Sequence, residues 1–320
     1  MAEEKDTNRG LPVWLWIVIG LVLLVIVPVA GCGAFGLAVG ASAGGASVQT
    51  AVRPSVAVIR VEGALLAGDS IASGTVAGSR TIIEMLEQAN NDSNIRAIVL
   101  RINSPGGGVT ASEEIHHAIT QVDKPVVVSM GTTAASGGYY IAAPADRIYA
   151  AESTITGSIG VISQFITAEQ FLDDVGVEVV YVTSGDLKDF GAIDTTLTED
   201  ELDYWQQIID DLHEDFIDVV AEGRDMSRSE VAMLADGRIY TGQQAVEVGL
   251  VDAIGYLDDA IAHAGELGGI GSDPPVVELT PQPTFFESLA GFSAPQQEPS
   301  IPDLIREMAA PTLEYRYIGP

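Results

Sequence analysis

Apolar and polar positions along the chain follow two periods, one typical of strands and one typical of helices. Three short and mainly apolar runs predict buried strands, at 56–61, 96–102 and 125–129. Amphipathic segments predict helices at 80–89 and 112–122, and a further helix is expected to begin near Ser136. Strands and helices that follow one another in this way predict an α/β fold with a largely parallel sheet.

A long amphipathic helix is predicted in the second half of the chain. The sequence Thr198-Glu-Asp-Glu201 is a capping box, which marks a helix start. The apolar positions after it recur at helical spacing: Leu202, Trp205, Ile209, Leu212, Phe216, Val219 and Val220. We expect this stripe to lie in the hydrophobic core rather than around a cofactor.

The N-terminal region contains an uncharged stretch from Gly10 to Val52. Its apolar part, residues 13–33, is long enough for a transmembrane helix, and Trp14 and Trp16 would lie at the membrane interface. A cleaved secretory signal is one alternative, and processing as a lipoprotein at Cys32 is another. The predicted organisation is an N-terminal segment 1–12, an anchor 13–33, a Gly/Ala/Ser-rich linker 34–51, a globular domain 52–269 and a C-terminal tail 270–320.

The tail is rich in Pro, Gln and Ser and ends in Thr312-Leu-Glu-Tyr-Arg-Tyr-Ile318, where bulky side chains alternate. Tails of this composition are typically loosely packed arms or disordered. An alternative is that the tail adds a strand to a groove of a neighbouring subunit.

Charge excludes several partners. The formal net charge is −30, from 45 acidic and 15 basic residues, so the surface repels nucleic acid and anionic lipid. Such a surface is typical of adaptation to high salt.

The single cysteine excludes an intrachain disulfide and a cysteine-rich metal site, and the four histidines lack the spacing of metal ligands. We therefore expect no cofactor.

Three glycine-rich turns follow strand-like runs. The first, Asn103-Ser-Pro-Gly-Gly-Gly108, is suited to an oxyanion hole because its backbone N–H groups are not shielded by side chains. The second, Thr133-Ala-Ala-Ser-Gly-Gly-Tyr139, presents Ser136 where a helix begins, as a nucleophile or as a helix cap. The third, Thr156-Gly-Ser-Ile-Gly160, contains Ser158.

A serine nucleophile needs a base, and Lys188 is the candidate. None of the histidines is well placed, and Lys188 is one of only three lysines against twelve arginines. It lies in a Gly/Ser-bounded loop after an expected strand at 178–182. A lysine acts as a base only when its amine is neutral, which burial favours, and the hydroxyl of Ser158 would orient such an amine without adding charge.

Together these motifs resemble the short form of signal peptide peptidase A (SppA), in the ClpP/crotonase-like superfamily. The resemblance covers about residues 54–268. Its further motifs are Thr156-Gly-Ser-Ile-Gly-Val161, Lys188-Asp189, Ala235-Asp-Gly-Arg-Ile-Tyr-Thr-Gly-Gln-Gln-Ala245 and Gly249-Leu-Val-Asp252. The separations of 52 residues from Ser136 to Lys188 and 22 to Ser158 fit the pattern of that family.

The resemblance implies a role for each site residue. Ser136 would be the nucleophile, Lys188 its base and Ser158 the partner of the lysine, while the backbone amides of Gly107 and Gly137 would form the oxyanion hole. The implied fold is a repeated ββα superhelix behind one membrane anchor. The implied assembly is a ring of identical subunits, with the catalytic domain on the extracytoplasmic side. The implied substrates are remnant signal peptides and other unfolded segments, with small or apolar residues favoured at the cut.

Three other functions compete with this hypothesis. A membrane-tethered Ser/Lys peptidase of the same superfamily that cuts a stomatin-like partner would carry the same dyad. A catalytically inactive crotonase-like scaffold would need neither Ser136 nor Lys188. A cytoplasmic crotonase acting on acyl-CoA thioesters would need no anchor.

Overall fold

The computed structural model describes residues 51–70, 75–280 and 313–317. The expected anchor 13–33 lies outside the described residues, as do most of the linker before residue 51 and much of the tail. In the described ranges, no helix combines the length and the hydropathy needed to cross a bilayer. The chain separates into units 1–48 and 49–320, and the second contains all the described residues.

The larger sheet has eight strands in the described part of the chain, and its main path runs β10-β8-β6-β4-β1-β12. β7 pairs with β6, and β11 pairs with β7. The strands are β1 (Ser55–Glu62), β4 (Ile95–Ser104), β6 (Val126–Ala135), β7 (Arg147–Ala150), β8 (Ile155–Gly157), β10 (Ile239–Thr241), β11 (Ala253–Ile254) and β12 (Val276–Leu279). All pairs are parallel except β10 with β8. The predicted α/β class and largely parallel sheet are confirmed.

A smaller sheet has the order β3-β2-β5-β13-β9. Its strands are β2 (Ala64–Leu66), β3 (Val76–Gly78), β5 (Gly106–Gly108), β9 (Ile162–Ser163) and β13 (Leu313–Arg316). β13 comes from the end of the chain and is antiparallel to both of its neighbours. The segment predicted as a tail therefore contributes β12 to one sheet and β13 to the other.

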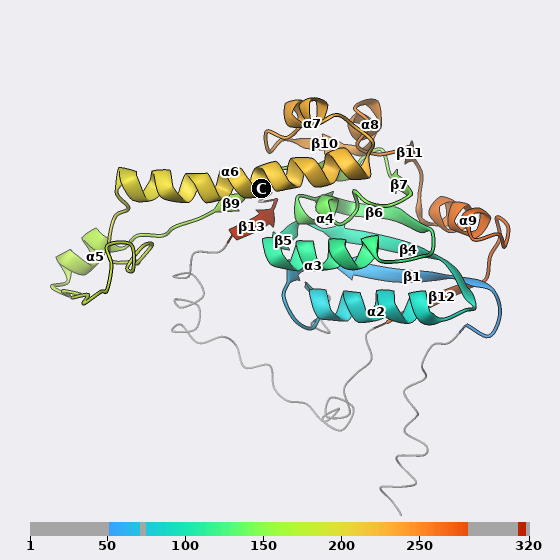
Figure 1. The fold of residues 1–320 in the computed structure, drawn as a ribbon, viewed down its shortest axis with the longest axis horizontal. Coiled ribbons are helices and arrows are strands. Elements are labelled where there is room, and N and C mark those ends of the chain that lie inside the picture. The colour runs from blue at the N-terminus through green and yellow to red at the C-terminus, as the bar shows by residue number, and fades with distance from the viewer. Residues whose placement is uncertain (1–50, 71–74, 281–312, 318–320) are drawn as a thin grey trace, which may run out of the picture. The chain divides into compact units, whose positions relative to one another are not determined.

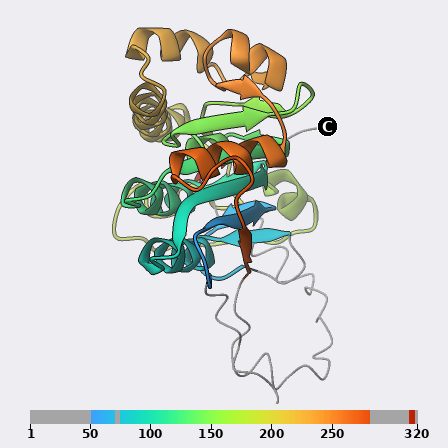
Figure 2. The same ribbon diagram turned by 90° about the vertical axis from the view of Figure 1, so that its right-hand side faces the viewer.

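Helices cover both faces of the larger sheet. Alternate residues of β1 and β4 face opposite sides: Ala57 and Ile98 join the cluster under α2 and α3, whereas Val56 and Ala97 join the cluster under α9. Because both faces are covered, these strands are apolar along most of their length, as buried parallel strands are. α2 and α3 lie side by side, and α9 lies against β4 and β6 (Figures 1 and 2). The helices are α2 (Ser79–Asn91), α3 (Val109–Thr120), α4 (Gly137–Tyr140), α5 (Glu169–Asp174), α6 (Glu199–Gly223), α7 (Arg228–Leu234), α8 (Gly242–Glu247) and α9 (Leu257–Leu267).

α6 begins at the predicted capping box, in which the side chain of Thr198 accepts a hydrogen bond from the Glu201 backbone. Only the C-terminal half of its apolar stripe lies in the core. Phe216 and Val220 are fully buried, but Leu202 remains 48% exposed. The prediction that the whole stripe is core was therefore wrong, because the first half of α6 extends past the elements that the second half packs on (Figure 1).

The segment between β9 and α6 also differs from the sequence prediction. Residues 177–183 form no strand, although a strand was expected at 178–182. Val180 is 74% exposed and Val182 is 96% exposed. A strand needs a neighbour for its backbone hydrogen bonds, and the described part of this chain presents none to these residues.

Candidate active site

Ser136 lies at the sharp turn between the end of β6 and the start of α4. Its φ of 52° and ψ of −119° place a non-glycine residue in a strained backbone region. The turn is held by a 2.7 Å hydrogen bond that the Ser136 backbone N–H donates to the carbonyl of Gly157. The residue is only 1% exposed. A strained serine at a strand-to-helix turn is the geometry of activated nucleophiles in other hydrolase folds.

The glycines of β5 lie against this turn. A Cβ atom at Gly106 would lie 2.6 Å from the backbone nitrogen of Gly137, and a Cβ at Gly137 would lie 3.2 Å from the Cα of Gly106. Neither position has room for a side chain, so glycine is required at both. The two expected oxyanion residues, Gly107 and Gly137, are thereby brought to the same place as Ser136.

Ser158 is brought to the same edge of the sheet. β6 and β8 are parallel neighbours in which Ala135 is paired with Gly157, so Ser136 and Ser158 each follow the last paired residue of their strand. The carboxyl ends of adjacent parallel strands meet at one edge, which is where α/β proteins bind ligands. Ser158 also has a positive φ, of 53°, and is 8% exposed.

Lys188 is not brought to this edge within one chain. It lies in an exposed turn in which its backbone N–H donates to the carbonyl of Gly185, at 3.1 Å. Figure 1 shows α5, and the loops near it, beyond the N-terminal end of α6 and away from α4. The expected Ser136–Lys188 pair is therefore not formed by the described residues of a single chain.

A cluster of aromatic side chains that the sequence pattern did not predict lies next to the serine turn. Tyr140 of α4 contacts Phe216 of α6 edge-to-face, with 5.0 Å between ring centroids, and stacks on Tyr315 of β13, also at 5.0 Å. Burial raises the pKa of both tyrosine hydroxyls, and the nearby carboxylates of Glu113 and Asp215 raise it further. The phenols of Tyr140 and Tyr315 are therefore neutral in this cluster. The tyrosine four residues after Ser136 was the one local signal for it.

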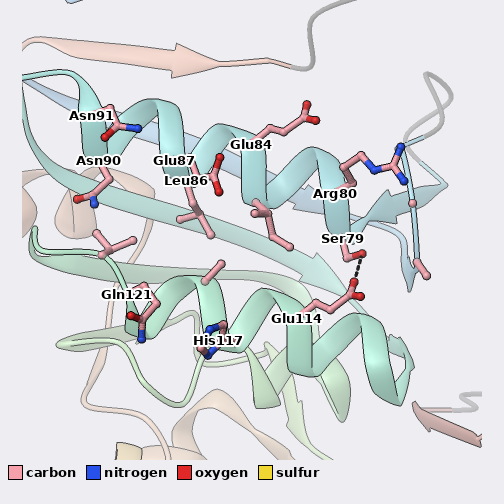
Figure 3. A pocket seen from close by; sticks show the side chains of 15 residues that line it. Ser79, Arg80, Glu84, Leu86, Glu87, Asn90, Asn91, Glu114, His117 and Gln121 are labelled. Atoms are coloured by element: carbon pink, nitrogen blue, oxygen red, sulfur yellow. Dashed lines mark hydrogen bonds between the residues drawn. The ribbon is translucent and has the colours of Figure 1, made fainter.

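An open groove of about 930 Å³ lies elsewhere, between α2 and α3. Figure 3 shows that polar side chains line it and that the Ser79 hydroxyl reaches Glu114; this hydrogen bond is 2.6 Å long. None of the expected catalytic residues lines this groove. Among the described residues, no group of three or more His, Cys, Asp or Glu residues is arranged to hold a metal ion.

Comparison with known proteins identifies the family. A model of peptidase family S49 matches residues 118–270, and a model of the Clp protease family matches residues 57–156. A proposed protease of Synechocystis sp. is 41% identical over 233 residues, which cover 72% of this chain and 80% of that protein. The chain belongs to peptidase family S49. The S49 match contains Ser136, Ser158 and Lys188, and the Clp protease match contains Gly107 and Gly137, the two glycines expected in the oxyanion hole.

In two other relatives, the region similar to this chain is less than two thirds of the protein. Protease 4 of Haemophilus influenzae is 37% identical over 228 residues, which cover 70% of this chain and 37% of that protein. A proposed signal peptide peptidase SppA of Enterococcus faecium is 39% identical over 212 residues, covering 65% of this chain and 61% of that protein. The chain thus spans less than two thirds of the length of each. By family, it is a serine peptidase.

Proposed function

We propose that this S49 chain is a membrane-anchored endopeptidase that hydrolyses remnant signal peptides and other unfolded or apolar segments through a Ser136/Lys188 dyad. The observation that carries the proposal is the meeting of Ser136, in its strained turn, with the glycines of β5 and with Ser158 at one edge of the sheet. The proposed fold is the repeated ββα superhelix of Clp-type peptidases, which the match over residues 57–156 supports.

In the proposed mechanism, the Ser136 hydroxyl attacks the carbonyl carbon of the scissile bond. Lys188, as a neutral amine, accepts the hydroxyl proton and passes it to the leaving amine. The backbone N–H groups of Gly107 and Gly137 stabilise the oxyanion that develops. Water then attacks the acyl carbon while Lys188 accepts a proton from that water. Lys188 returns the proton to the Ser136 oxygen as the acyl bond breaks, and Ser158 holds the amine in place.

The lysine in this mechanism comes from a neighbouring copy of the chain. Lys188 lies on a segment of exposed apolar side chains, which supports an assembly that covers them: Phe171, Val175, Val177, Val179, Val180, Tyr181, Val182 and Leu187. Head-to-tail contacts close into a ring where the rotation between neighbouring subunits adds up to a full turn, which is the assembly proposed here. Burial in such an interface also favours the neutral amine that a lysine base requires.

The proposed location is the cell membrane, with the catalytic domain on the extracytoplasmic side. The uncharged run from Gly10 to Val52 supports an anchor at residues 13–33. Nucleic acid is not a proposed partner, because the net charge of −30 repels it.

Paired variants test the dyad and its arrangement. We expect Ser136→Ala and Lys188→Ala each to abolish hydrolysis of an unfolded casein substrate in high salt. The two variants are then mixed 1:1, unfolded together and refolded. If Lys188 acts across subunits, the mixture should regain about one quarter of the native activity. The reason is that about one site in four combines an intact serine with an intact lysine from its neighbour.

Lys124→Ala is the matched control. The Lys124 ammonium donates to the backbone carbonyls of Ala89 and Asp92, both at 2.6 Å, so its role is structural and the variant should remain active. Full activity in Ser136→Ala or Lys188→Ala would exclude the dyad. Inactivity of the refolded mixture would exclude a lysine supplied by a neighbour. Sequencing of the peptide products would separate general signal-peptide cleavage from cleavage of one stomatin-like partner.

A further inference from the structure

The loop that carries Lys188 is attached to α6 by aromatic side chains. Phe190, two residues after the lysine, contacts Trp205 of α6, with 5.1 Å between ring centroids. It also meets Phe165 edge-to-face at 5.3 Å, and Phe165 meets Trp205 edge-to-face at 5.8 Å. Each ring thus contacts the other two. Phe165, Phe190 and Trp205 together form the aromatic clamp.

The aromatic clamp joins the two ends of the segment that contains α5 and Lys188. Phe165 precedes this segment, and Phe190 lies at its end. A backbone hydrogen bond closes the same base, because the Ala168 N–H donates to the carbonyl of Ile193 at 2.6 Å. Figure 1 shows the segment beyond the N-terminal end of α6. It therefore projects as a loop whose two ends are held together at the helix.

The residues of the loop beyond this base are exposed. Every residue from 173 to 188 is exposed, and burial resumes at Asp189 and Phe190. Lys188 is thus the last exposed residue before the aromatic clamp. Phe190 carries the first side chain after the lysine that packs on α6. The position of the Lys188 backbone relative to α6 is therefore set by how firmly Phe190 is held.

α6 connects the aromatic clamp to the serine turn of its own chain. Its 25 residues form a helix about 37 Å long. Near its C-terminal end, Phe216 contacts Tyr140 of α4, and a Cβ atom at Gly223 would lie 2.4 Å from the carbonyl oxygen of Ala143. Trp205 lies in the other half of the helix. One rigid element thus packs beside the serine turn at one end and holds the lysine loop at the other.

Ring packing holds the aromatic clamp together. The indole N–H of Trp205 is buried and has no hydrogen-bond partner among the described residues. A buried donor without a partner costs free energy, and the contacts between the three rings offset this cost. Removal of the Phe190 ring should therefore loosen the attachment of the lysine loop to α6.

We propose that Phe190 is a positioning residue, and that the aromatic clamp fixes the loop on α6 so that the Lys188 amine meets the serine of the neighbouring subunit. The proposal rests on the proposed function, whose base it concerns. A lysine amine ends a flexible stem of four carbons, so its position depends on how firmly its backbone is held. Displacement of a catalytic group by about 1 Å can lower the rate by about 100-fold.

Single substitutions separate positioning from substrate binding. We expect Phe190→Ala to lower kcat for an unfolded peptide by about 10- to 100-fold with KM unchanged, because the base moves and the peptide still binds. Phe190→Tyr keeps the ring and should restore the native kcat. Tyr256→Ala is the matched control, because it removes an aromatic side chain that is 66% exposed, and its kcat should be native. A native kcat in Phe190→Ala would overturn the proposal.

A comparison of mixed assemblies tests which subunit needs Phe190. In mixture A, a chain carrying Ser136→Ala and Phe190→Ala is refolded 1:1 with a chain carrying Lys188→Ala. In mixture B, a chain carrying Ser136→Ala is refolded 1:1 with a chain carrying Lys188→Ala and Phe190→Ala. A site that contains both Ser136 and Lys188 takes its lysine from the Ser136→Ala chain. This lysine lies beside an altered clamp in mixture A and beside an intact clamp in mixture B.

We expect mixture B to regain about one quarter of the native activity, and mixture A at least about tenfold less. Both mixtures contain the same substitutions in the same amounts, so a general effect of Phe190→Ala on folding or assembly lowers both. Equal activity in the two mixtures would overturn the proposal. Where Phe190→Ala reduces assembly, as measured by sedimentation, Phe190→Leu takes its place in both mixtures and the same comparison decides.

Failure of the inference is distinguishable from failure of the proposed function. If Lys188→Ala remains active, the proposed function fails and the inference fails with it. If Lys188→Ala is inactive while Phe190→Ala keeps the native kcat, only the inference fails. An inactive mixture of Ser136→Ala with Lys188→Ala would exclude a lysine supplied by a neighbour and would overturn the inference as well.

Discussion

Two residues of the site are held in backbone conformations that most side chains avoid. Among the described residues, the non-glycine residues with positive φ are Ser136, Ser158 and Asp225, and the first two lie at the same sheet edge. Each such conformation costs on the order of 1–3 kcal/mol and persists only where the surroundings enforce it. Here the enforcing contacts are the hydrogen bonds from Ser136 N–H to Gly157 and from Ser158 N–H to Arg238.

Two substitutions at position 158 distinguish the contribution of the hydroxyl to catalysis from the cost of the positive φ to stability. We expect both Ser158→Ala and Ser158→Gly to lower kcat by roughly tenfold, because in the proposed mechanism this hydroxyl orients the amine of Lys188. Glycine adopts positive φ freely, so Ser158→Gly should be more stable than Ser158→Ala by roughly 1 kcal/mol. Steady-state kinetics and urea unfolding measure the two effects. A native kcat in Ser158→Gly would remove Ser158 from the mechanism.

At the scale of elements, α3 and α4 pack against each other beside β5. α3 supplies His116, whose ring contacts Tyr140 of α4 edge-on, with 5.2 Å between centroids. Burial lowers the pKa of His116, with Glu222 opposing this effect and His117 adding to it. The neutral imidazole is thus the form that fits between the two helices.

This pKa shift predicts a loss of stability in mild acid. The folded pKa lies below the unfolded value of about 6.5, so between these two values the unfolded chain binds a proton that the folded chain does not. The free energy of unfolding should therefore fall as pH decreases below about 6.5. In His116→Gln, the decrease in the free energy of unfolding that His116 causes should be absent. In His117→Gln it should remain, because the His117 side chain is exposed. Urea unfolding at pH 7.5 and 5.5 measures the slopes; identical slopes in the native chain and His116→Gln would contradict the assignment.

At the scale of the whole molecule, the net charge of −30 places like charges close together over the surface. α6 concentrates them: ten of its 25 residues are acidic. Self-repulsion opposes the compact state, and salt reduces it by shortening the screening length from about 10 Å at 0.1 M to about 3 Å at 1 M.

Stability should therefore increase with salt. We expect the free energy of unfolding in urea to rise between 0.1 and 1 M sodium chloride. The rise should be smaller in a variant that combines Asp203→Asn with Asp211→Asn, two exposed positions on α6. Stability that does not change with salt, or that changes equally in both chains, would argue against electrostatic adaptation to a saline environment.

The local pattern of the sequence determined the features that depend on neighbouring residues. The strand at 96–102, the capping box at Thr198 and the glycine turn around Ser136 were all predictable, because periodicity, capping and turn chemistry act over a few residues. Ser158 was predicted as the partner of the lysine from its glycine turn and from the family resemblance. Its position beside Ser136 follows from the pairing of β6 with β8, which the sequence pattern did not show.

The tertiary structure alone decided the features that depend on distant segments. The start of the α6 stripe is exposed, because burial depends on what lies opposite a helix face and not on its periodicity. The exposure of Lys188, and of residues 177–183, which form no strand, has the same cause. Tyr315 packs beside the serine turn because β13 pairs with both β5 and β9, and no pattern within residues 312–318 specifies which strands such a segment will join.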